Sequence, residues 1–167
     1  MTAVPIRALH PYEVCIAPGL LPDLGPRAAA LLPPRRAMLV SDDRVYPLYG
    51  PAAEVSLTRA GFRVSRFVFP HGEKSKSLST YTALGGALFD NGFTGGDSII
   101  ALGGGVVGDL AGFAAATYHR GLPYMQVPTT LLSAVDSSVG GKTAVDLDSG
   151  KNQAGCFYQP SLVLCDP

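Results

Sequence analysis

A glycine-rich segment has the spacing of a dinucleotide-binding turn. The pattern G-x-G-x-x-G occurs within Gly103-Gly104-Gly105-Val106-Val107-Gly108-Asp109, after an apolar run and before a helical pattern. Glycines at such a turn let backbone N–H groups approach a pyrophosphate, and the N-terminus of the next helix favours its negative charge. The segment indicates either a nucleotide site or a tight turn that only packs a helix against a sheet.

Two features differ from a standard Rossmann site. The glycine turn is not the first strand-to-helix turn of the chain, and no acidic residue stands at the end of the next apolar run. Asp42 stands at the end of an earlier apolar run. Its carboxylate could accept a ribose hydroxyl in place of the missing acid.

A second segment ends like a phosphate-binding P-loop, G-x-x-x-x-G-K-T. It reads Asp136-Ser137-Ser138-Val139-Gly140-Gly141-Lys142-Thr143, so Asp136 replaces the first glycine and would point negative charge into a phosphate cradle. Leu162–Asp166 could be the apolar strand that, in such ATPases, ends in the Asp that holds Mg²⁺. The alternatives are that Lys142 is a point charge for a phosphorylated substrate, or that it lies unpaired in a surface loop.

Three further polar segments stand between expected elements. Glu73 and Lys76, in His71-Gly72-Glu73-Lys74-Ser75-Lys76, could bind the sugar and phosphates of a nucleotide, although such a stretch is also typical of a solvated loop before a helix. Arg120 follows an apolar helix, where it either pairs with the helix C-terminus or binds a phosphate. Lys151 and Asn152 come directly after Gly150, in a turn or at a ligand.

The order of apolar runs predicts the elements that position these residues. Short runs alternate with helical patterns, which indicates one α/β domain over 1–167 with a Rossmann-like, mostly parallel sheet flanked by helices. The expected strands are Ile6–Leu9, Tyr12–Ile16, Ala37–Val40, Phe62–Phe69, Ser98–Leu102, Tyr124–Val127 and Leu162–Cys165. The first two form an N-terminal β-hairpin around His10-Pro11. Expected helices are Leu20–Leu32, one ending at Val55–Ala60 before Gly61, one from the N-cap Ser77 to Gly92, and Val106–Ala116.

Composition excludes several classes of protein. The 167 residues contain 13 Lys plus Arg and 13 Asp plus Glu, so the basic excess of a nucleic-acid binder is absent. The longest weakly apolar run, Ile99–Ala116, contains Asp109 and several glycines, and no membrane span is expected. Three cysteines without C-x-x-C favour a reducing cytoplasm, and the three separated histidines provide no metal-ligand set.

In combination and order, these segments resemble the 3-dehydroquinate synthases, sugar-phosphate cyclases of the shikimate pathway to chorismate and the aromatic amino acids. The resemblance covers nearly the whole chain. It rests on residues 71–77, 103–121, 126–132, 136–143 and 150–152. It implies an α/β domain that binds NAD and a phosphorylated sugar-acid substrate.

The resemblance also implies roles for individual residues. Asp136, Lys142 and Asn152 would face the substrate, and Arg120 would reach the substrate phosphate of a neighbouring subunit, which implies a homodimer. The dinucleotide would be lined by Asp42, His71, Gly72, Glu73, Lys74, Ser75, Lys76, Gly104, Gly105, Val106, Val107, Gly108, Asp109, Thr129, Thr130, Leu132, Lys142 and Lys151.

The family reaction converts 3-deoxy-D-arabino-heptulosonate 7-phosphate to 3-dehydroquinate and phosphate. NAD⁺ transiently oxidises a substrate hydroxyl, phosphate is eliminated, and the hydride returns before ring closure, so there is no net oxidation. Lys142 and Arg120 would position anionic groups. In this family the substrate phosphate can itself serve as the base, in keeping with the absence of a conspicuous His base in the sequence.

One departure from the family matters. Its members are longer and bind zinc or cobalt through one Glu and two His of a helical C-terminal domain, and those positions are absent from this chain. We expect the 167 residues to bind NAD but to be inactive alone. The open alternatives are another sugar-phosphate cyclase, a metal-dependent polyol dehydrogenase, a P-loop ATPase and a non-catalytic NAD-binding module.

Overall fold

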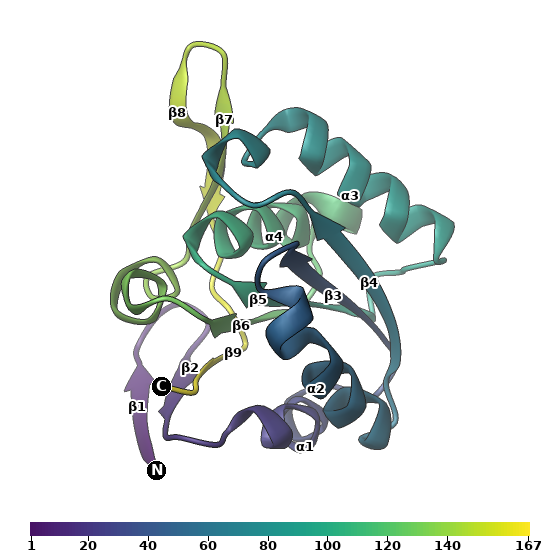
Figure 1. Ribbon diagram of the computed structural model, residues 1–167, viewed down its shortest axis with the longest axis vertical. Helices are drawn as coiled ribbons and strands as arrows, with labels where there is room; N and C mark the ends of the chain where they lie inside the picture. The colour runs from purple at the N-terminus through teal and green to yellow at the C-terminus, as the bar shows by residue number, and fades with distance from the viewer.

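The computed structural model describes residues 1–167 and has three layers, with helices on both faces of one sheet (Figure 1). The seven-stranded sheet has the order β1-β2-β9-β6-β5-β3-β4. Only β1 is antiparallel to its neighbour. The expected Rossmann-like, mostly parallel sheet is confirmed. Its strands are β1 Thr2–Ile6, β2 Tyr12–Ile16, β3 Arg36–Asp42, β4 Arg63–Phe69, β5 Ser98–Gly103, β6 Tyr124–Pro128 and β9 Leu162–Cys165.

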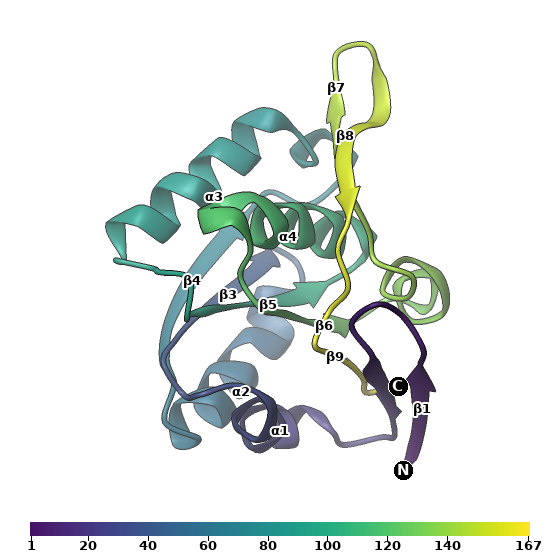
Figure 2. The ribbon, with the colours of Figure 1, turned by 180° about the vertical axis from the view of Figure 1, so that it is seen from behind.

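Two helices cover each face of the sheet. On one face lie α1 (Leu24–Leu31) and α2 (Tyr46–Arg59), and on the other lie α3 (Leu78–Asp90) and α4 (Gly105–Thr117) (Figures 1 and 2). Side chains alternate between the faces along each strand, so Leu39 packs toward α1 and α2 and Met38 toward α3 and α4. Every residue of β5 is buried, as expected for a central parallel strand covered on both sides.

The direction in which strands are added reverses at β3. β4 lies on one side of β3, whereas β5 and then β6 lie on the other side. In such sheets a crevice opens outside the carboxyl ends of the two strands at the reversal, and ligands bind there. Asp42 ends β3 and Gly103 ends β5. The fold therefore brings the glycine turn and Asp42 to the usual ligand position.

The sequence did not predict the hairpin of β7 (Lys142–Leu147) and β8 (Gly150–Phe157). It projects from the domain beside α3 and α4 (Figures 1 and 2). β7 packs closely on α4, because a Cβ at Gly112 would lie 2.5 Å from Thr143 Cγ2. A methyl group at position 112 would hold the hairpin away from the helix.

The hairpin also excludes the P-loop reading. In a P-loop the Lys-Ser/Thr pair opens a helix whose N-terminus faces the phosphates. Here Lys142 and Thr143 begin β7, and Asp136 lies in a π-helical turn at Ser133–Ser137. The alternative of a P-loop ATPase is therefore wrong.

Three element boundaries differ from the sequence reading. β1 is Thr2–Ile6 and not Ile6–Leu9, because a two-residue hairpin turn needs either a positive φ at both central residues, which Pro11 cannot adopt, or glycine at the first, where His10 stands. The expected helix Leu20–Leu32 is a 3-10 turn, Leu21–Asp23, followed by α1. α2 starts at Tyr46 and contains Pro51, whereas the sequence indicated only the end of this helix, at Val55–Ala60.

The other helix ends agree with expectation. Ser77 Oγ accepts the Thr80 N–H at the start of α3, and Gly92 follows its end with a φ of 67°. Gly61 follows α2 with a φ of 93°. None of the helices has both the length and the apolar character that a bilayer span requires.

Candidate active site

A cavity of about 710 Å³ lies between α4, the segment before α3 and the β7–β8 hairpin. It is lined from α4 by Gly105, Val106 and Asp109, from the loop before α3 by Glu73 and Lys76, and from the segment after β6 by Leu132, Asp136 and Ser137. β7 and β8 add Lys142 and Asn152. The structure thus brings together residues from most of the segments predicted from the sequence. We call this space the central cavity.

The N-terminus of α4 opens toward the central cavity without a side-chain cap. Gly104 is extended at the N-cap position, with φ −77° and ψ −169°, and no side chain accepts from the first turn. The first N–H groups of a helix have no partner within the helix and favour anions. A Cβ at Gly105 would lie 3.1 Å from Ser137 Oγ, and the buried hydroxyls of Ser137 and Thr129 have no hydrogen-bond partner. This open, polar cradle fits a pyrophosphate.

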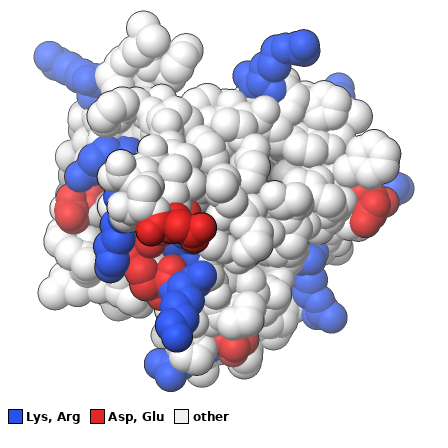
Figure 3. Space-filling model, turned by 90° about the horizontal axis from the view of Figure 1, so that it is seen from above, with Lys and Arg blue, Asp and Glu red and all other residues white.

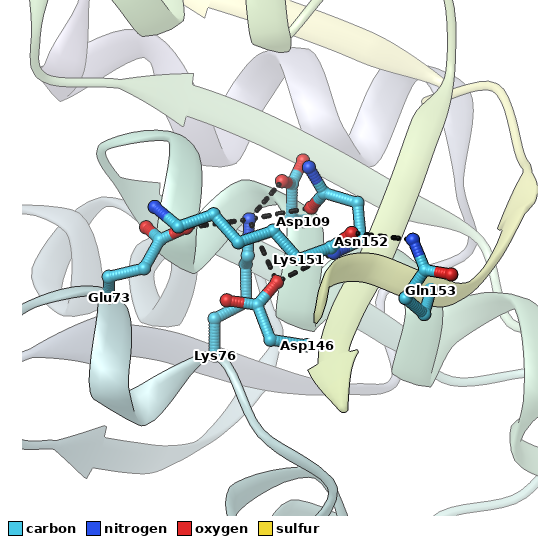
Figure 4. A network of polar contacts seen from close by, with 7 residues as sticks. All are labelled: Glu73, Lys76, Asp109, Asp146, Lys151, Asn152 and Gln153. Atoms are coloured by element: carbon cyan, nitrogen blue, oxygen red, sulfur yellow. Dashed lines mark hydrogen bonds and ion pairs between the residues drawn. The ribbon is translucent and has the colours of Figure 1, made fainter. Parts of the chain in front are cut away.

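Lys76 is the centre of a polar network beside that cradle (Figure 4). The residue is only 5% exposed. Its Nζ donates to Asn152 Oδ1 at 2.7 Å and lies 3.3 Å from Glu73, 3.4 Å from Asp109 and 3.7 Å from Asp146. Burial alone would lower the pKa of Lys76, but the surrounding carboxylates outweigh it and raise the pKa. Lys76 is therefore a fixed cation.

At Asp109, unlike at Lys76, the effect of burial on the pKa is larger than the effect of the neighbouring charges. Burial raises the pKa of its carboxyl group to about 6, and the charge of Lys76 offsets only part of that effect. The carboxyl group is thus close to the pH range in which a proton can be taken up or released near neutrality. Perturbed carboxyl groups of this kind in a cavity are typical of functional sites.

A second, more exposed ion pair lies at the cavity. Lys142 Nζ is 3.6 Å from Asp136, and both side chains are more than half exposed. Lys151 Nζ lies 3.2 Å from Glu73 at the edge of the Lys76 network. Figure 3 looks down on the end of the molecule from which β7 and β8 project, and acidic and basic side chains lie next to one another there. The cavity therefore offers charges of both signs to a ligand.

Several other predicted residues do not line the central cavity. Asp42 Oδ1 accepts the N–H groups of Arg44 and Val45, both at 2.9 Å. His71 bonds Asp43 through its backbone N–H and Nδ1, and this contact lowers the pKa of Asp43. Gly72 has a φ of 100°. Lys74 is exposed, and Ser75 donates its hydroxyl to the carbonyl of Pro70.

Part of the glycine turn is packed into the core. Val107 is fully buried in the core, and a Cβ at Gly108 would lie 2.5 Å from Gln126 Oε1.

Thr129 and Thr130 line a second cavity of about 680 Å³, which is mostly apolar and lies at the ends of β5, β6 and β9. The two cavities flank the glycine turn, because Gly105 lines one and Leu102 the other.

Arg120 is not part of the central cavity. It is exposed and follows the far end of α4, and a helix of this length separates it from Gly105 by about 20 Å. His119 and Arg120 both have left-handed backbone conformations, with φ of 48° and 66°. Within one chain, Arg120 therefore cannot contact a ligand in this cavity.

Sequence reasoning missed Asp146 and the cavity-lining residues Thr143, Gln153, Cys156 and Phe157. All lie in the unexpected hairpin. A signal was present, since Leu147-Asp148-Ser149-Gly150 places turn-forming residues after an alternating run. The structure contains no cluster of three or more His, Cys, Asp or Glu side chains that could hold a metal ion.

The family model and the curated relatives that match this chain carry the same name. Residues 66–167 match the family model described as 3-dehydroquinate synthase N-terminal. The 3-dehydroquinate synthase of Latilactobacillus sakei is 52% identical over 156 residues, which cover 93% of this chain and 44% of that protein. The chain therefore spans less than half the length of this relative.

Two solved structures share the fold over essentially the whole chain. The 2-deoxy-scyllo-inosose synthase solved with carbaglucose-6-phosphate, NAD⁺ and Co²⁺ superposes with a TM-score of 0.89 at 31% identity, covering 99% of this chain and 46% of that one. The 2-epi-5-epi-valiolone synthase of Streptomyces hygroscopicus subsp. jinggangensis, solved with NAD⁺ and Zn²⁺, has a TM-score of 0.83 at 32% identity. It is covered over 45% of its length, and this chain over 100%.

Proposed function

Since the chain belongs to the 3-dehydroquinate synthase family, matched by its N-terminal model over residues 66–167, we propose that it binds NAD⁺ as the dinucleotide-binding half of such an enzyme. One observation carries the proposal. The uncapped N-terminus of α4 faces a polar cavity at the reversal point of a parallel sheet.

The residues present fit a dinucleotide. The N–H groups of Gly105 and Val106 would bind the pyrophosphate, and the partnerless hydroxyls of Thr129 and Ser137 are available to it. Lys76 and Asp109 lie on one side of that cradle, and Thr130 and the second cavity lie on the other. Asp42 is the acid nearest the end of β3. When bound, NAD⁺ supplies a reversible hydride acceptor for a substrate hydroxyl.

The substrate side of the cavity would be formed by Asp136, Lys142 and Asn152. Lys142 offers an exposed ammonium group to an anionic oxygen, and Asn152 offers an amide. A phosphorylated sugar acid such as 3-deoxy-D-arabino-heptulosonate 7-phosphate suits this set, with 3-dehydroquinate and phosphate as products. Arg120 would act on the substrate of a second copy in a homodimer, since it does not reach the cavity of its own chain.

We assign no step to a metal in these 167 residues, because their side chains do not form a metal site. We propose that the chain alone binds NAD⁺ without turnover, and that a C-terminal half of a relative completes the cavity. The elimination of phosphate makes the proposed reaction that of a lyase.

Phosphate release from 3-deoxy-D-arabino-heptulosonate 7-phosphate tests the proposal. The assay contains NAD⁺ and Zn²⁺, and it compares the chain alone with the chain plus the C-terminal half of a relative. Release only with the added half is the expected result. Release by the chain alone would overturn the proposed inactivity. Accumulation of NADH without phosphate release would favour the polyol dehydrogenase alternative, and release only from a different sugar phosphate would favour another cyclase.

A further inference from the structure

Asp146, in the unexpected hairpin, links two residues of the central cavity. Its backbone N–H donates to the Lys76 carbonyl at 2.8 Å, and its Oδ1 accepts the Asn152 N–H at 2.7 Å. The same Oδ1 lies 3.7 Å from Lys76 Nζ. The strand register shifts between Val145 and Leu147, so Asp146 sits at a bulge in the ladder. Such bulges re-aim side chains next to functional sites.

Asn152 has a backbone conformation that needs support. Its φ is 55°, in the left-handed region that non-glycine residues seldom occupy. Asn tolerates this region better than most residues. The hydrogen bond from its N–H to Asp146 connects the two strands across the hairpin and fixes the backbone in that conformation.

The left-handed backbone places the Asn152 amide on Lys76. The ammonium group has only donors, so the amide atom 2.7 Å away must be the oxygen. The amide nitrogen is then the free end of the side chain, because the bond from Lys76 to the amide oxygen is the only hydrogen bond of the Asn152 side chain. Asn152 lines the central cavity. The residue therefore presents a donor and not an acceptor.

We infer that Asp146 is a positioning residue: it holds Asn152 left-handed, so that Lys76 takes the amide oxygen and the amide N–H₂ group faces a ligand oxygen in the central cavity. The ligand class, a hydroxyl, carboxylate or phosphate oxygen of a phosphorylated sugar acid, rests on the proposed function. The geometry of Asp146, Lys76 and Asn152 does not.

Nuclear magnetic resonance of the ¹⁵N-labelled chain tests this role directly. In Asp146→Ala, the backbone amide of Asn152 should exchange with solvent about ten-fold faster, because its acceptor is gone. The Asn152 side-chain N–H₂ resonance should move toward that of a free amide, as it should in Lys76→Met. Asp146→Asn keeps an acceptor oxygen, so it should retain part of the protection and remains informative if Asp146→Ala does not fold.

Asp148 provides a matched control in the same hairpin. It is exposed in the turn two residues away and makes no hydrogen bond or ion pair. Asp148→Ala removes the same charge and should change neither readout. Wild-type exchange and resonance positions in Asp146→Ala would overturn the inference. Failure of the wild-type chain to bind NAD⁺ would instead count against the proposed function and leave these readouts unaffected.

Discussion

Lys76 Nζ lies 3.4 Å from Asp109 Oδ2, which ties the segment before α3 to the helix that follows the glycine turn. The contact joins residues 33 positions apart in the sequence. It places a buried cation and a carboxyl group with a raised pKa beside the same uncapped helix N-terminus.

Lys76→Met should weaken NAD⁺ binding about ten-fold, or ~1.4 kcal/mol. The substitution leaves the carboxylates of Glu73, Asp109 and Asp146 without their shared cation, next to the expected phosphates. Calorimetric titration measures the change. Arg59→Met is the control, because Arg59 is exposed at the end of α2, is not among the predicted dinucleotide-binding residues and forms no ion pair. Equal losses in the two variants would show that only the overall charge matters.

The raised pKa of Asp109 predicts a pH-dependent stability. The folded pKa is about 6 against an ordinary value of 3.8, so folding favours the protonated form. The contribution of Asp109 to the free energy of unfolding is therefore fully present below pH 3.8 and is lost as pH rises to about 6. Since Asp109→Asn stays neutral, its stability relative to wild type should rise by at most about 3 kcal/mol from pH 4 to pH 7.

Urea unfolding of wild type and Asp109→Asn at pH 4, 5, 6 and 7 checks this expectation. The difference between the two proteins should change only across that range and level off above it. A difference that stays constant with pH would mean that the Asp109 carboxyl group has an ordinary pKa in the folded chain.

Gly105→Ala should reduce NAD⁺ binding at least about ten-fold while leaving the fold intact. The new methyl group would fill the cradle 3.1 Å from Ser137 Oγ, but Gly105 does not have a positive φ, so the helix tolerates alanine. Gly86→Ala in α3 is the matched control. No atom lies within 4 Å of a Cβ there, and this variant should gain about 0.5–1 kcal/mol of stability with unchanged binding.

Gly112→Ala should destabilise the domain by about 1–3 kcal/mol, because its Cβ would lie 2.5 Å from Thr143 Cγ2 and 3.2 Å from Tyr124. Thr143→Ser removes the clashing methyl group but keeps the hydroxyl that donates to the Cys156 carbonyl. The double variant should lose less free energy of unfolding than the two single variants lose together. Additive losses in urea unfolding would contradict close packing of α4 on β7.

The sheet and the glycine turn were predictable because local patterns determine them. The apolar run at Ser98–Leu102 has the length of a buried strand, and Gly103 to Gly108 has the spacing of a turn before a helix. The hairpin was not predictable in the same way. β8 contains Gly150, Gly155 and several exposed polar residues, because most of it projects from the core. The sequence of β8 therefore shows no clear alternation of apolar and polar residues.

The composition of the site was only partly predictable. Lys76, Asp109 and Asn152 were identified as separate candidates, but the contact between Lys76 and Asn152 joins positions 76 residues apart. Only the three-dimensional position of the hairpin brings them together. Asp146 was missed because its role depends on a strand bulge and on the left-handed backbone of Asn152, and neither leaves a pattern in the sequence.

Titration of the 167-residue chain with NAD⁺ in a calorimeter tests the central claim most directly, with Gly105→Ala alongside. We predict saturable binding of one NAD⁺ per chain that is weakened at least about ten-fold in Gly105→Ala. A folded wild-type chain that shows no binding heat and no thermal stabilisation by NAD⁺, or one that binds NAD⁺ equally well with alanine at position 105, would contradict it.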